Sequence, residues 1–417
     1  MVGTTGDYIH WIDRQYPGRA LFLTDPQARA RATEPAPESI GEVLSDLTDE
    51  ATVWAALGKH LDQHRLEISG VVCFDDEAMH LAALLARRLH LPYPSPQAVL
   101  TCRNKHLCKE AWRACGVPTA RAILAATDSQ AADFAASVNA PVVLKPATGS
   151  GSELAFQCRT PAQAAQAFRD IREGLAARSD SRMYSGDAAG CLEKNPAILA
   201  EEFVTGQEYS CDFIVENSRA HVIRFARKIL AHDAPLGTAR GYTIPSPPPG
   251  PEPQSIASFL ARAANAVGIE RSICMLDFFV DDGRLALLEI APRPGGDCLP
   301  WLIRYSSGLD MLGLALDFAQ RRPVAIPPAD KWQPMVGLRI RAEREGTLRR
   351  VDTSLLAADP RVRQIHLTRA PGHKVVLPPA DYDSWIFGHV VFAPDAGVSA
   401  ESQCDELRGK LRLEIEP

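Results

Sequence analysis

The segment 274–297, CMLDFFVDDGRLALLEIAPRPGGD, constrains the fold more than any other part of the chain. Its two apolar runs are joined by a turn with the sequence Asp-Asp-Gly, which predicts a β-hairpin. Asp277 interrupts the first run, and Glu289 interrupts the second run twelve residues later. At this spacing the two carboxylates are expected to face each other across an antiparallel ladder.

The two carboxylates predict a metal site. Like charges side by side repel, and an unpaired carboxylate among apolar residues is costly. An all-oxygen site with positions open for water and phosphate suits Mg²⁺. The alternative is that Asp277 and Glu289 are surface acids on opposite strands with unrelated roles.

A candidate phosphate site follows the β-branched strand that ends at Lys145. The next residues are small, and their backbone N–H groups can cradle phosphate oxygens; they are Thr148, Gly149, Ser150, Gly151 and Ser152. The lysine precedes the glycines, which is not the P-loop order. Taken alone, such a loop is more often a surface loop.

The segment 201–208, EEFVTGQE, is the third candidate. Alone it predicts a solvated hairpin edge. Beside a nucleotide, an extended segment offers backbone groups to adenine, and a carboxylate such as Glu208 accepts hydrogen bonds from ribose hydroxyls.

The chain length of 417 residues suggests about three domains. Strand-like runs at 19–25 and 68–76 alternate with a helical pattern at 77–91, which predicts a small parallel α/β domain over 1–100. Mixed segments follow over 101–200 and 201–327, and strand-like runs dominate 328–417. The fold class predicted is therefore α/β and α+β, in several domains, with a β-rich C-terminal unit.

Charge and composition exclude several classes of protein. The net charge is −6 with a pI near 6.0 and no basic run, which argues against a nucleic-acid partner. No apolar stretch reaches the roughly 18 residues of a membrane span. The first residues lack a signal-peptide pattern, and the ten cysteines form no C-x-x-C pair, so a cytoplasmic protein with reduced thiols is expected.

The ordered set of Lys105, VVLKPATGSGS, EEFVTGQEYS, LDFFVDDGRLALLEIAPRPGGD and GLD resembles the ATP-grasp superfamily. The resemblance covers roughly residues 100–325. It points to the carboxylate–amine ligases, which include amino-acid (dipeptide) ligases and purine-pathway carboxylases. It implies a two-lobed ATP-binding region between the N-terminal domain and the C-terminal unit. Dimers are common among proteins of this kind, so a homodimer is an option that the sequence leaves open.

The resemblance also implies a role for each matching residue. Lys105, Lys145 and Lys228 match bases that contact ATP phosphates, and residues 148–152 match a mobile phosphate lid. The adenine hinge and ribose-binding acid correspond to Glu201, Glu202, Val204 and Glu208. The magnesium ligands correspond to Asp277 and Glu289, with Mn²⁺ as an alternative metal. Arg293 matches the arginine that steadies the acyl phosphate, and Gly295, Gly296 and Asp297 continue into a substrate pocket.

The implied reaction joins a small carboxylate to an amine through an acyl phosphate, with release of ADP and phosphate and with an amino acid as one substrate. The alternatives are another acceptor, as in a bicarbonate-dependent carboxylase or a kinase, and a catalytically silent nucleotide-binding scaffold. Ala291 stands where many relatives have a metal-binding asparagine, which leaves the number of metal ions open. His232, close to Lys228, is the one histidine considered for a catalytic or metal-binding role, and Trp301, Arg304 and Tyr305 are candidates to lie near the second substrate. The shape of the substrate pocket is expected to depend on the N-terminal domain, the 179–196 segment and the C-terminal unit.

Overall fold

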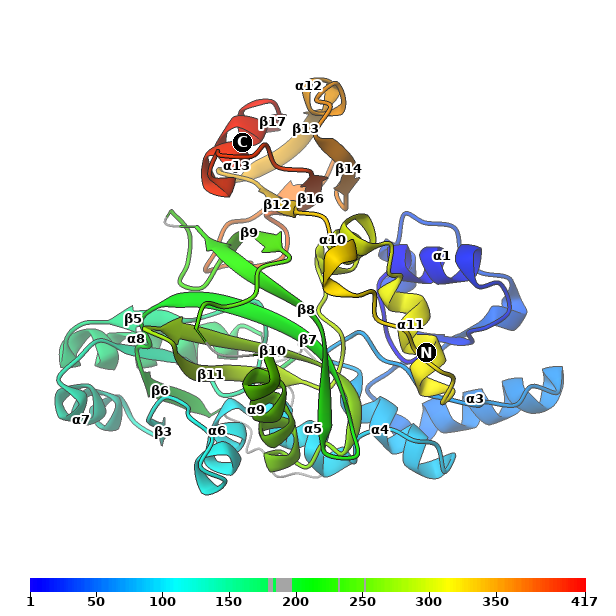
Figure 1. The fold of residues 1–417 in the computed structure, drawn as a ribbon, viewed down its shortest axis with the longest axis horizontal. Helices are drawn as coiled ribbons and strands as arrows, with labels where there is room; N and C mark the ends of the chain where they lie inside the picture. The colour runs from blue at the N-terminus through cyan, green and yellow to red at the C-terminus, as the bar shows by residue number, and fades with distance from the viewer. Residues whose placement is uncertain (179–182, 185–196, 232, 251–252) are drawn as a thin grey trace.

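The computed structural model describes residues 1–178, 183–184, 197–231, 233–250 and 253–417. His232 and nearly all of the 179–196 segment lie outside these residues. The described chain is a mixed α/β molecule built around one large antiparallel sheet, with smaller sheets beside it (Figure 1). The predicted fold class is confirmed.

The N-terminal unit is a small parallel sheet with helices. Strand β1 (Phe22–Thr24) pairs in parallel with β2 (Glu42–Leu44). The surrounding helices are α1 (Gly6–Gln15), α2 (Pro26–Arg31), α3 (Glu50–His64), α4 (Met79–Arg88) and α5 (Pro96–Arg103), with a 3₁₀ turn η1 at Ser39–Gly41.

The strand predicted over 68–76 is wrong, because this segment joins no ladder in the described structure. Its one backbone link to the small sheet is Val2 N donating to Val72 O at 2.9 Å. The run is apolar for another reason. Val71 and Cys73 pack into the N-terminal core, whereas Val72 packs into the core shared with the large sheet.

The small lobe holds a four-stranded antiparallel sheet in the order β3-β6-β4-β5. These strands are β3 (Ala122–Ala125), β6 (Ile198–Glu202), β4 (Val142–Pro146) and β5 (Phe156–Cys158). Its helices are α6 (Lys105–Ala114), α7 (Asp128–Val138) and α8 (Pro161–Ala176). The side chains of Asn104, Thr127 and Thr160 cap the N-termini of these helices, which fixes where each helix begins.

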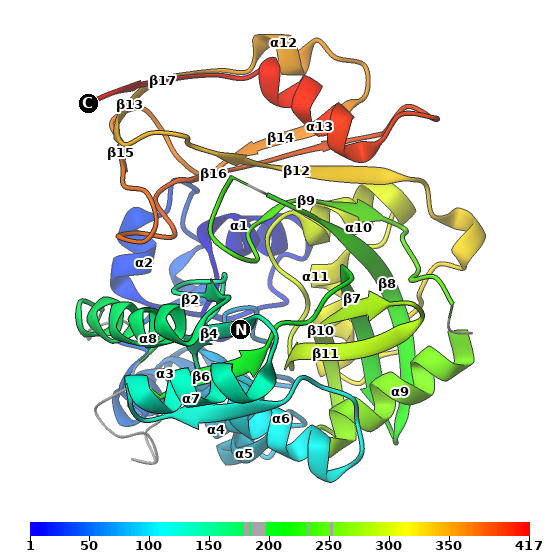
Figure 2. The same ribbon diagram turned by 90° about the vertical axis from the view of Figure 1, so that its left-hand side faces the viewer.

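The large sheet has eight strands in the order β11-β10-β7-β8-β9-β12-β16-β14, and every neighbouring pair is antiparallel. The first five are β11 (Arg284–Ala291), β10 (Arg271–Asp281), β7 (Gln207–Glu216), β8 (Arg219–Leu230) and β9 (Ala239–Ile244). Helices α9 (Pro253–Ala266), α10 (Leu299–Ser307) and α11 (Met311–Ala319) belong to the same lobe. Figure 2 shows the small lobe facing the β10–β11 end of this sheet.

The C-terminal region is rich in strands as expected, but it is not separate from the large sheet. Strands β12 (Met335–Arg341), β14 (Val362–Leu367) and β16 (Ile386–Phe392) continue that sheet. A three-stranded sheet lies beyond them, with β13 (Gly346–Asp352), β15 (Lys374–Val375) and β17 (Arg412–Glu416). The remaining elements are η2 (Ala329–Lys331), α12 (Ser354–Ala357) and α13 (Ala400–Gly409). The residue 327/328 boundary is therefore no boundary of the sheet.

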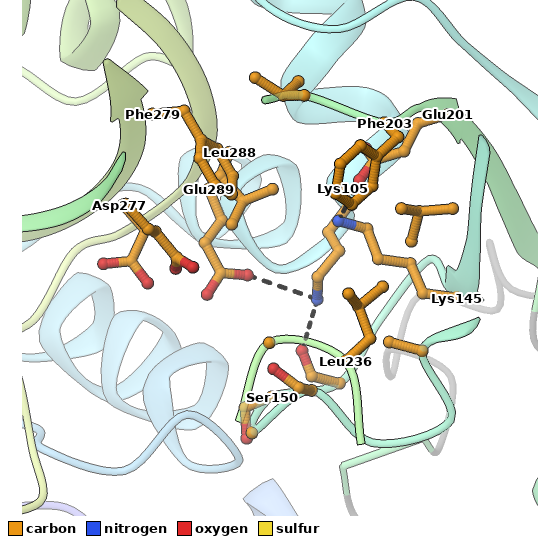
Figure 3. Close-up of a pocket in the computed structure, with 18 of the residues that line it drawn as sticks. Lys105, Lys145, Ser150, Glu201, Phe203, Leu236, Asp277, Phe279, Leu288 and Glu289 are labelled. Carbon is orange, nitrogen blue, oxygen red and sulfur yellow. Dashed lines mark hydrogen bonds and ion pairs between the residues drawn. The ribbon is translucent and has the colours of Figure 1, made fainter. Parts of the chain in front are cut away.

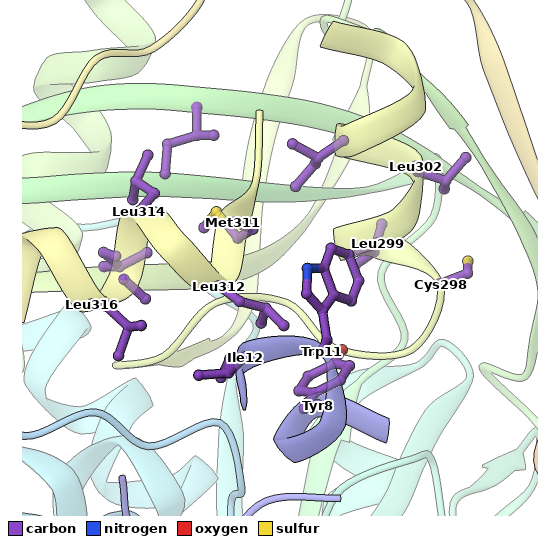
Figure 4. Packing of buried hydrophobic residues seen from close by; sticks show 14 of the residues in the cluster. Tyr8, Trp11, Ile12, Cys298, Leu299, Leu302, Met311, Leu312, Leu314 and Leu316 are labelled. Atoms are coloured by element: carbon purple, nitrogen blue, oxygen red, sulfur yellow. The ribbon is translucent and has the colours of Figure 1, made fainter. Parts of the chain in front are cut away.

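Helix α1 attaches the N-terminal unit to the large lobe. Tyr8, Trp11 and Ile12 on α1 point toward the apolar side chains of α10 and α11 (Figure 4). The Trp11 indole also donates a hydrogen bond of 3.0 Å to Asp310, which caps α11. This core fixes the end of α1 against the loop after β11. Among the helices that the structure describes, none has the length and apolarity that a bilayer crossing demands.

Candidate active site

Asp277 and Glu289 are direct partners in the β10–β11 ladder, and the register shifts just after Asp277. Figure 3 shows their carboxylates side by side at one end of a cavity between the lobes. The predicted hairpin and the predicted pairing of these two residues are confirmed. Asp277 is buried, and its Oδ1 atom accepts no hydrogen bond from the described part of the chain.

This pair of acids fits a divalent cation. An orphaned buried carboxylate oxygen is costly unless another group satisfies it. Glu289 is partly exposed to the cavity, so both acids offer hard oxygen ligands on its wall. The described residues contain no group of three or more metal-ligating side chains. Phosphate and water oxygens would therefore complete the coordination, as is usual for Mg²⁺.

Lys228 on β8 links two acids of the site. Its Nζ lies 2.5 Å from Glu208 Oε1 and 2.6 Å from Asp277 Oδ2. Burial opposes the lysine's charge, but the two carboxylates outweigh it and hold the pKa of Lys228 well above its ordinary value. Burial also raises the pKa of Glu208, against the attraction of Lys228. The expected phosphate-contacting base and ribose-binding acid are thus linked by ion pairs to Asp277, the expected metal ligand.

The other two lysines stand on the small-lobe side. Lys105 Nζ donates to Gly149 O at 2.6 Å and lies 3.6 Å from Glu289 Oε2, so it spans the cavity from the loop to the hairpin (Figure 3). Lys145 Nζ lies 2.5 Å from Glu201 Oε1. Burial lowers the pKa of Lys105 although Glu289 opposes the change. The structure therefore brings all three predicted lysines to one cavity.

Glu201 is shared between two lysines. Besides Lys145 it pairs with Lys109, whose Nζ is 3.1 Å from Glu201 Oε2. Burial would raise the pKa of Glu201, but the two lysines lower it to about 2, so the carboxylate is charged. Lys109 is fully buried and also donates to the Thr119 hydroxyl at 3.1 Å. The Glu201 side chain thus positions Lys145.

The predicted hinge residues differ in how free their backbones are. Glu201 and Glu202 lie in β6, which pairs with β3 on one side and β4 on the other. Val204 follows the end of this strand and lines the cavity together with Phe203. An adenine edge needs unpaired backbone groups, and the Phe203 N–H already donates to Pro141 O at 3.0 Å, so Val204 suits that role better than the two glutamates.

The loop after β4 covers the same cavity. Gly149 and Gly151 have positive φ values of +115° and +67°, and Ser152 has +61°. A Cβ atom on Gly149 would lie 2.8 Å from the Tyr184 ring, so a larger residue does not fit there. Tyr184 in turn donates a hydrogen bond to Glu153. The loop conformation therefore depends on glycine and places small residues against the lysines.

Arg293 lies in the loop after β11. Its Nε donates to Asp76 Oδ1 at 2.7 Å, and Nη1 donates to Pro294 O at 2.8 Å. Burial alone would lower the pKa of Arg293, but the neighbouring Asp76 carboxylate outweighs burial and raises this pKa. The guanidinium is therefore always charged. Asp76 comes from the N-terminal unit and is 217 residues away in sequence.

A buried ion pair in the large sheet holds the residues that follow Arg293. Arg224 Nε donates to Asp212 Oδ2 at 2.8 Å, and both side chains are 0% exposed. The other oxygen of Asp212 accepts a hydrogen bond of 2.8 Å from Gly295 N. Further along the loop, Asp297 Oδ2 lies 2.7 Å from Arg339 Nε on β12.

Three cavities meet around these residues. The first cavity, of about 330 Å³, lies between the lobes and is lined by the three lysines and by Asp277 and Glu289; it is called the nucleotide cavity after the ligand expected there. The junction cavity, of about 270 Å³, shares those acids and reaches Arg293, Gly296 and Asp297. The outer cavity, of about 750 Å³, starts from the same three loop residues and extends between the N-terminal unit and β14–β16. The site thus runs continuously from the hairpin past Arg293.

Comparison with known proteins decides the family. A model of the ATP-grasp domain matches residues 138–300, from just before β4 into α10. A D-alanine–D-alanine ligase of Aromatoleum aromaticum is 27% identical over 249 residues, covering 56% of this chain and 71% of that ligase. Residues 138–300 are an ATP-grasp domain, and the chain is similar to ligases of the carboxylate–amine type.

Other similar proteins cover more of this chain. The uncharacterized protein y4rH of Sinorhizobium fredii is 27% identical over 366 residues, 87% of this chain and 71% of that protein. The L-amino acid ligase of Bacillus licheniformis has the same fold, with a TM-score of 0.77 at 17% identity and coverage of 100% and 98% of the two chains. The biotin carboxylase domain of a Hydrogenobacter thermophilus 2-oxoglutarate carboxylase follows with a TM-score of 0.68 at 15% identity, covering 99% of this chain and 90% of that domain.

Several residues of this ATP-grasp site were missed by sequence reasoning. Lys109 could have been predicted from the sequence, because it lies one helical turn after Lys105 on α6. Asp76 was visible as an acid after an apolar run, but nothing in the sequence links it to Arg293. The Asp212–Arg224 ion pair could not be predicted, because the alternation of apolar and polar residues along β7 and β8 does not show which polar residues are buried together.

Proposed function

We propose that this ligase uses ATP to convert a small carboxylate into an acyl phosphate and then joins it to an amine. ADP and phosphate are released, and an amino acid is one of the substrates. The observation that carries the proposal is the continuity of the three cavities. A charged, lysine-rich nucleotide cavity opens past Arg293 into a space large enough for small organic molecules.

On the nucleotide side, Lys105, Lys145 and Lys228 are placed to offset the phosphate charge of ATP. Asp277 and Glu289 would hold Mg²⁺, with Mn²⁺ as an alternative, and the bound metal would neutralise charge on the β- and γ-phosphates. Phosphoryl transfer needs mainly positioning and charge neutralisation, which these side chains supply. Phe203 and Val204 would bound the adenine, and Glu208 remains the proposed ribose-binding acid.

On the acceptor side, Arg293 would steady the negative oxygen that develops when the amine adds to the acyl phosphate. A fixed charged donor at such a position contributes about 3 kcal/mol in comparable sites. Asp76 holds the guanidinium in place before the substrates arrive. The 148–152 loop lines all three cavities through Ser150, so it is placed to exclude water from the acyl phosphate.

This chain is similar to D-alanine–D-alanine ligases and to an L-amino acid ligase, and the names of these proteins describe enzymes that join amino acids. Carboxylating enzymes also share the fold. The amide-forming reaction is preferred here because the chain is similar in sequence to D-alanine–D-alanine ligases, whereas its likeness to the carboxylating enzymes is one of fold alone.

The test is a coupled assay with ATP, Mg²⁺ and pooled amino acids and small carboxylates. We expect ADP, phosphate and a new amide mass. Glu289→Gln should lower ADP formation by roughly 10²-fold or more without changing the fold, because it removes one metal-binding charge. Asp282→Asn is the matched control, since Asp282 is an exposed acid in the turn of the same hairpin.

Formation of AMP and pyrophosphate would contradict the acyl-phosphate route. Unchanged turnover in Glu289→Gln would contradict the metal assignment. A stable phosphate ester or a carboxylated amine as the product would replace the amide ligase by one of the other acceptor reactions.

A further inference from the structure

The outer cavity is lined by parts of the chain that are distant in sequence. Residues 4–9, at the start of α1, form one wall, and β14 and β16 with the segment between them form another. The Arg293–Asp297 loop closes the end toward the nucleotide. A molecule in this cavity therefore contacts the N-terminal unit and the C-terminal strands together.

The two sides of Arg293 differ in charge. The junction cavity is lined by five lysines and arginines and four carboxylates, which suits phosphate. The outer cavity is lined by seven carboxylates and only four arginines. Three of those arginines are already paired, Arg29 with Glu42, Arg293 with Asp76 and Arg369 with Asp383. Three of the carboxylates are paired with arginines as well, because Asp297 pairs with Arg339 besides the pairs of Asp76 and Asp383, but the acids still outnumber the bases. The outer cavity therefore favours a cation.

Asp7 is one of the carboxylates held in this wall. It lies in the first turn of α1, and its Oδ2 is 3.4 Å from His366 Nε2 on β14. Burial alone would raise the pKa of Asp7, but the hydrogen bond with His366 outweighs burial and lowers this pKa. Asp7 therefore stays ionised. A favourable interaction with the helix dipole would account for an acid here, but it would not account for the neighbouring histidine.

A second histidine, His389 on β16, lies beside His366 in the sheet. It is the ladder partner of both His366 on β14 and Arg339 on β12, and the two imidazole centroids are 5.1 Å apart. His389 is only 3% exposed, yet it lines the outer cavity, and its Nε2 has no hydrogen-bond partner in the described chain. A buried polar atom left without a partner is costly, so a ligand atom at this position would stabilise the site.

We propose that the outer cavity binds an amine substrate that carries a second, protonated amino group, held by Asp7 and His389. This inference rests on the proposed ligase function and names the class of its amine: a diamine or a basic amino acid. Asp7 supplies the counter-charge, and the free nitrogen of neutral His389 accepts one of the ammonium hydrogens. The reactive nitrogen is then directed toward Arg293.

The test compares L-lysine with L-norleucine, which has the same side-chain carbons but no second amino group. Binding is measured by calorimetry without nucleotide, so the result does not depend on turnover. We expect lysine to bind about tenfold or more tightly, because one desolvated ion pair distinguishes the two. Asp7→Asn, which keeps the shape of the side chain, should abolish this preference.

Asp383→Asn is the matched control. Asp383 lines the same cavity, but its side chain is 85% exposed and is paired with Arg369. The preference for lysine should survive this change. Thermal unfolding of both variants verifies that they are folded, and His389→Asn provides a second variant in which the preference should fall.

Equal binding of lysine and norleucine, or binding of neither, would overturn the inference. So would a preference that persists in Asp7→Asn, or one that is lost equally in Asp383→Asn. ADP release is measured in parallel. ADP release with norleucine and lysine at equal kcat/KM would reject this subsite but leave the ligase proposal standing. Lysine binding without ADP release under any substrate pool would support the subsite but reject the ligase proposal.

Discussion

Lys109 acts on the site without facing the substrate. It lines none of the cavities described above, and it reaches the nucleotide cavity only through Glu201, which also holds Lys145. Removing the lysine leaves a buried carboxylate with one partner instead of two. Breaking a buried ion pair in this way costs about 3 kcal/mol.

We therefore expect Lys109→Met to lower the free energy of unfolding by about 3 kcal/mol and to raise KM for ATP more than it lowers kcat. The reason is that Lys145 would follow a displaced Glu201. Urea unfolding and steady-state kinetics measure the two effects. The double variant Lys109→Met, Glu201→Gln also removes the carboxylate partner of the buried Lys145, so it should lose further stability and should not regain the KM for ATP. A single variant with normal KM for ATP would show that Glu201 does not position Lys145.

At the scale of elements, the loop after β11 depends on the strands beneath it. A Cβ atom on Gly295 would lie 2.7 Å from Arg224 Nη2 and 2.8 Å from a methyl of Leu299. Neither neighbour has room to move, because Arg224 is held by the buried pair with Asp212. The loop that carries Arg293 therefore tolerates no side chain at this point.

Gly295→Ala should lower the free energy of unfolding by about 1–3 kcal/mol, as overpacking of a core does. It should also reduce turnover more than ATP binding, since the loop faces the acceptor and not the adenine. Gly296→Ala is the control for stability, because the nearest atom to a Cβ there is 4.0 Å away. Equal melting temperatures for the two variants would mean that the loop is not held rigidly by Asp212.

The elements that the sequence predicts well are those whose evidence is local. The hairpin was predictable because its turn, its apolar runs and the spacing of Asp277 and Glu289 all lie within one segment. The 68–76 strand was wrong because burial between two cores gives the same apolar run as a ladder does. The sequence did not predict that β12, β14 and β16 join the large sheet, because the residue pattern of a strand does not indicate which strand it pairs with.

The same limit applies to the candidate site. Its three lysines and two acids followed from an ordered pattern along the chain, and the structure brings them to one cavity. The partners that hold the site residues in place, such as Asp76 and Lys109, come from contacts that only the folded chain creates. Resemblance to a family suggests which residues face the nucleotide, whereas packing decides which residues support them.

At the scale of the whole molecule, His389 marks where the N-terminal unit, the large lobe and the C-terminal strands meet. Charged and titratable groups face it from each of them: Asp7 from α1, Asp297 from the loop after β11, His366 from β14 and Arg339 from β12. Burial lowers the pKa of His389 from 6.5 to about 4, and His366 and Arg339 oppose its protonation further. The folded protein thus keeps this imidazole neutral where the unfolded chain would protonate it.

The stability of the enzyme should therefore depend on pH in a defined window. Below pH 6.5 the unfolded state gains a proton that the folded state does not bind until about pH 4, so the free energy of unfolding falls as the pH decreases through this range. The loss attributable to His389 is about 3 kcal/mol at most. His389→Gln cannot be protonated, so its stability should fall less than that of the wild type between pH 6.5 and pH 5, a range in which most carboxylates are still ionised.

Urea unfolding at a series of pH values measures this difference directly. His221→Gln makes the same exchange at an exposed position of β8 and should follow the wild-type curve. If His389→Gln also follows the wild-type curve, the folded state must protonate His389 near its ordinary pKa, which would require Asp7 and Asp297 to outweigh burial. A flatter curve for His389→Gln alone would show that the three parts of the molecule close around a neutral imidazole.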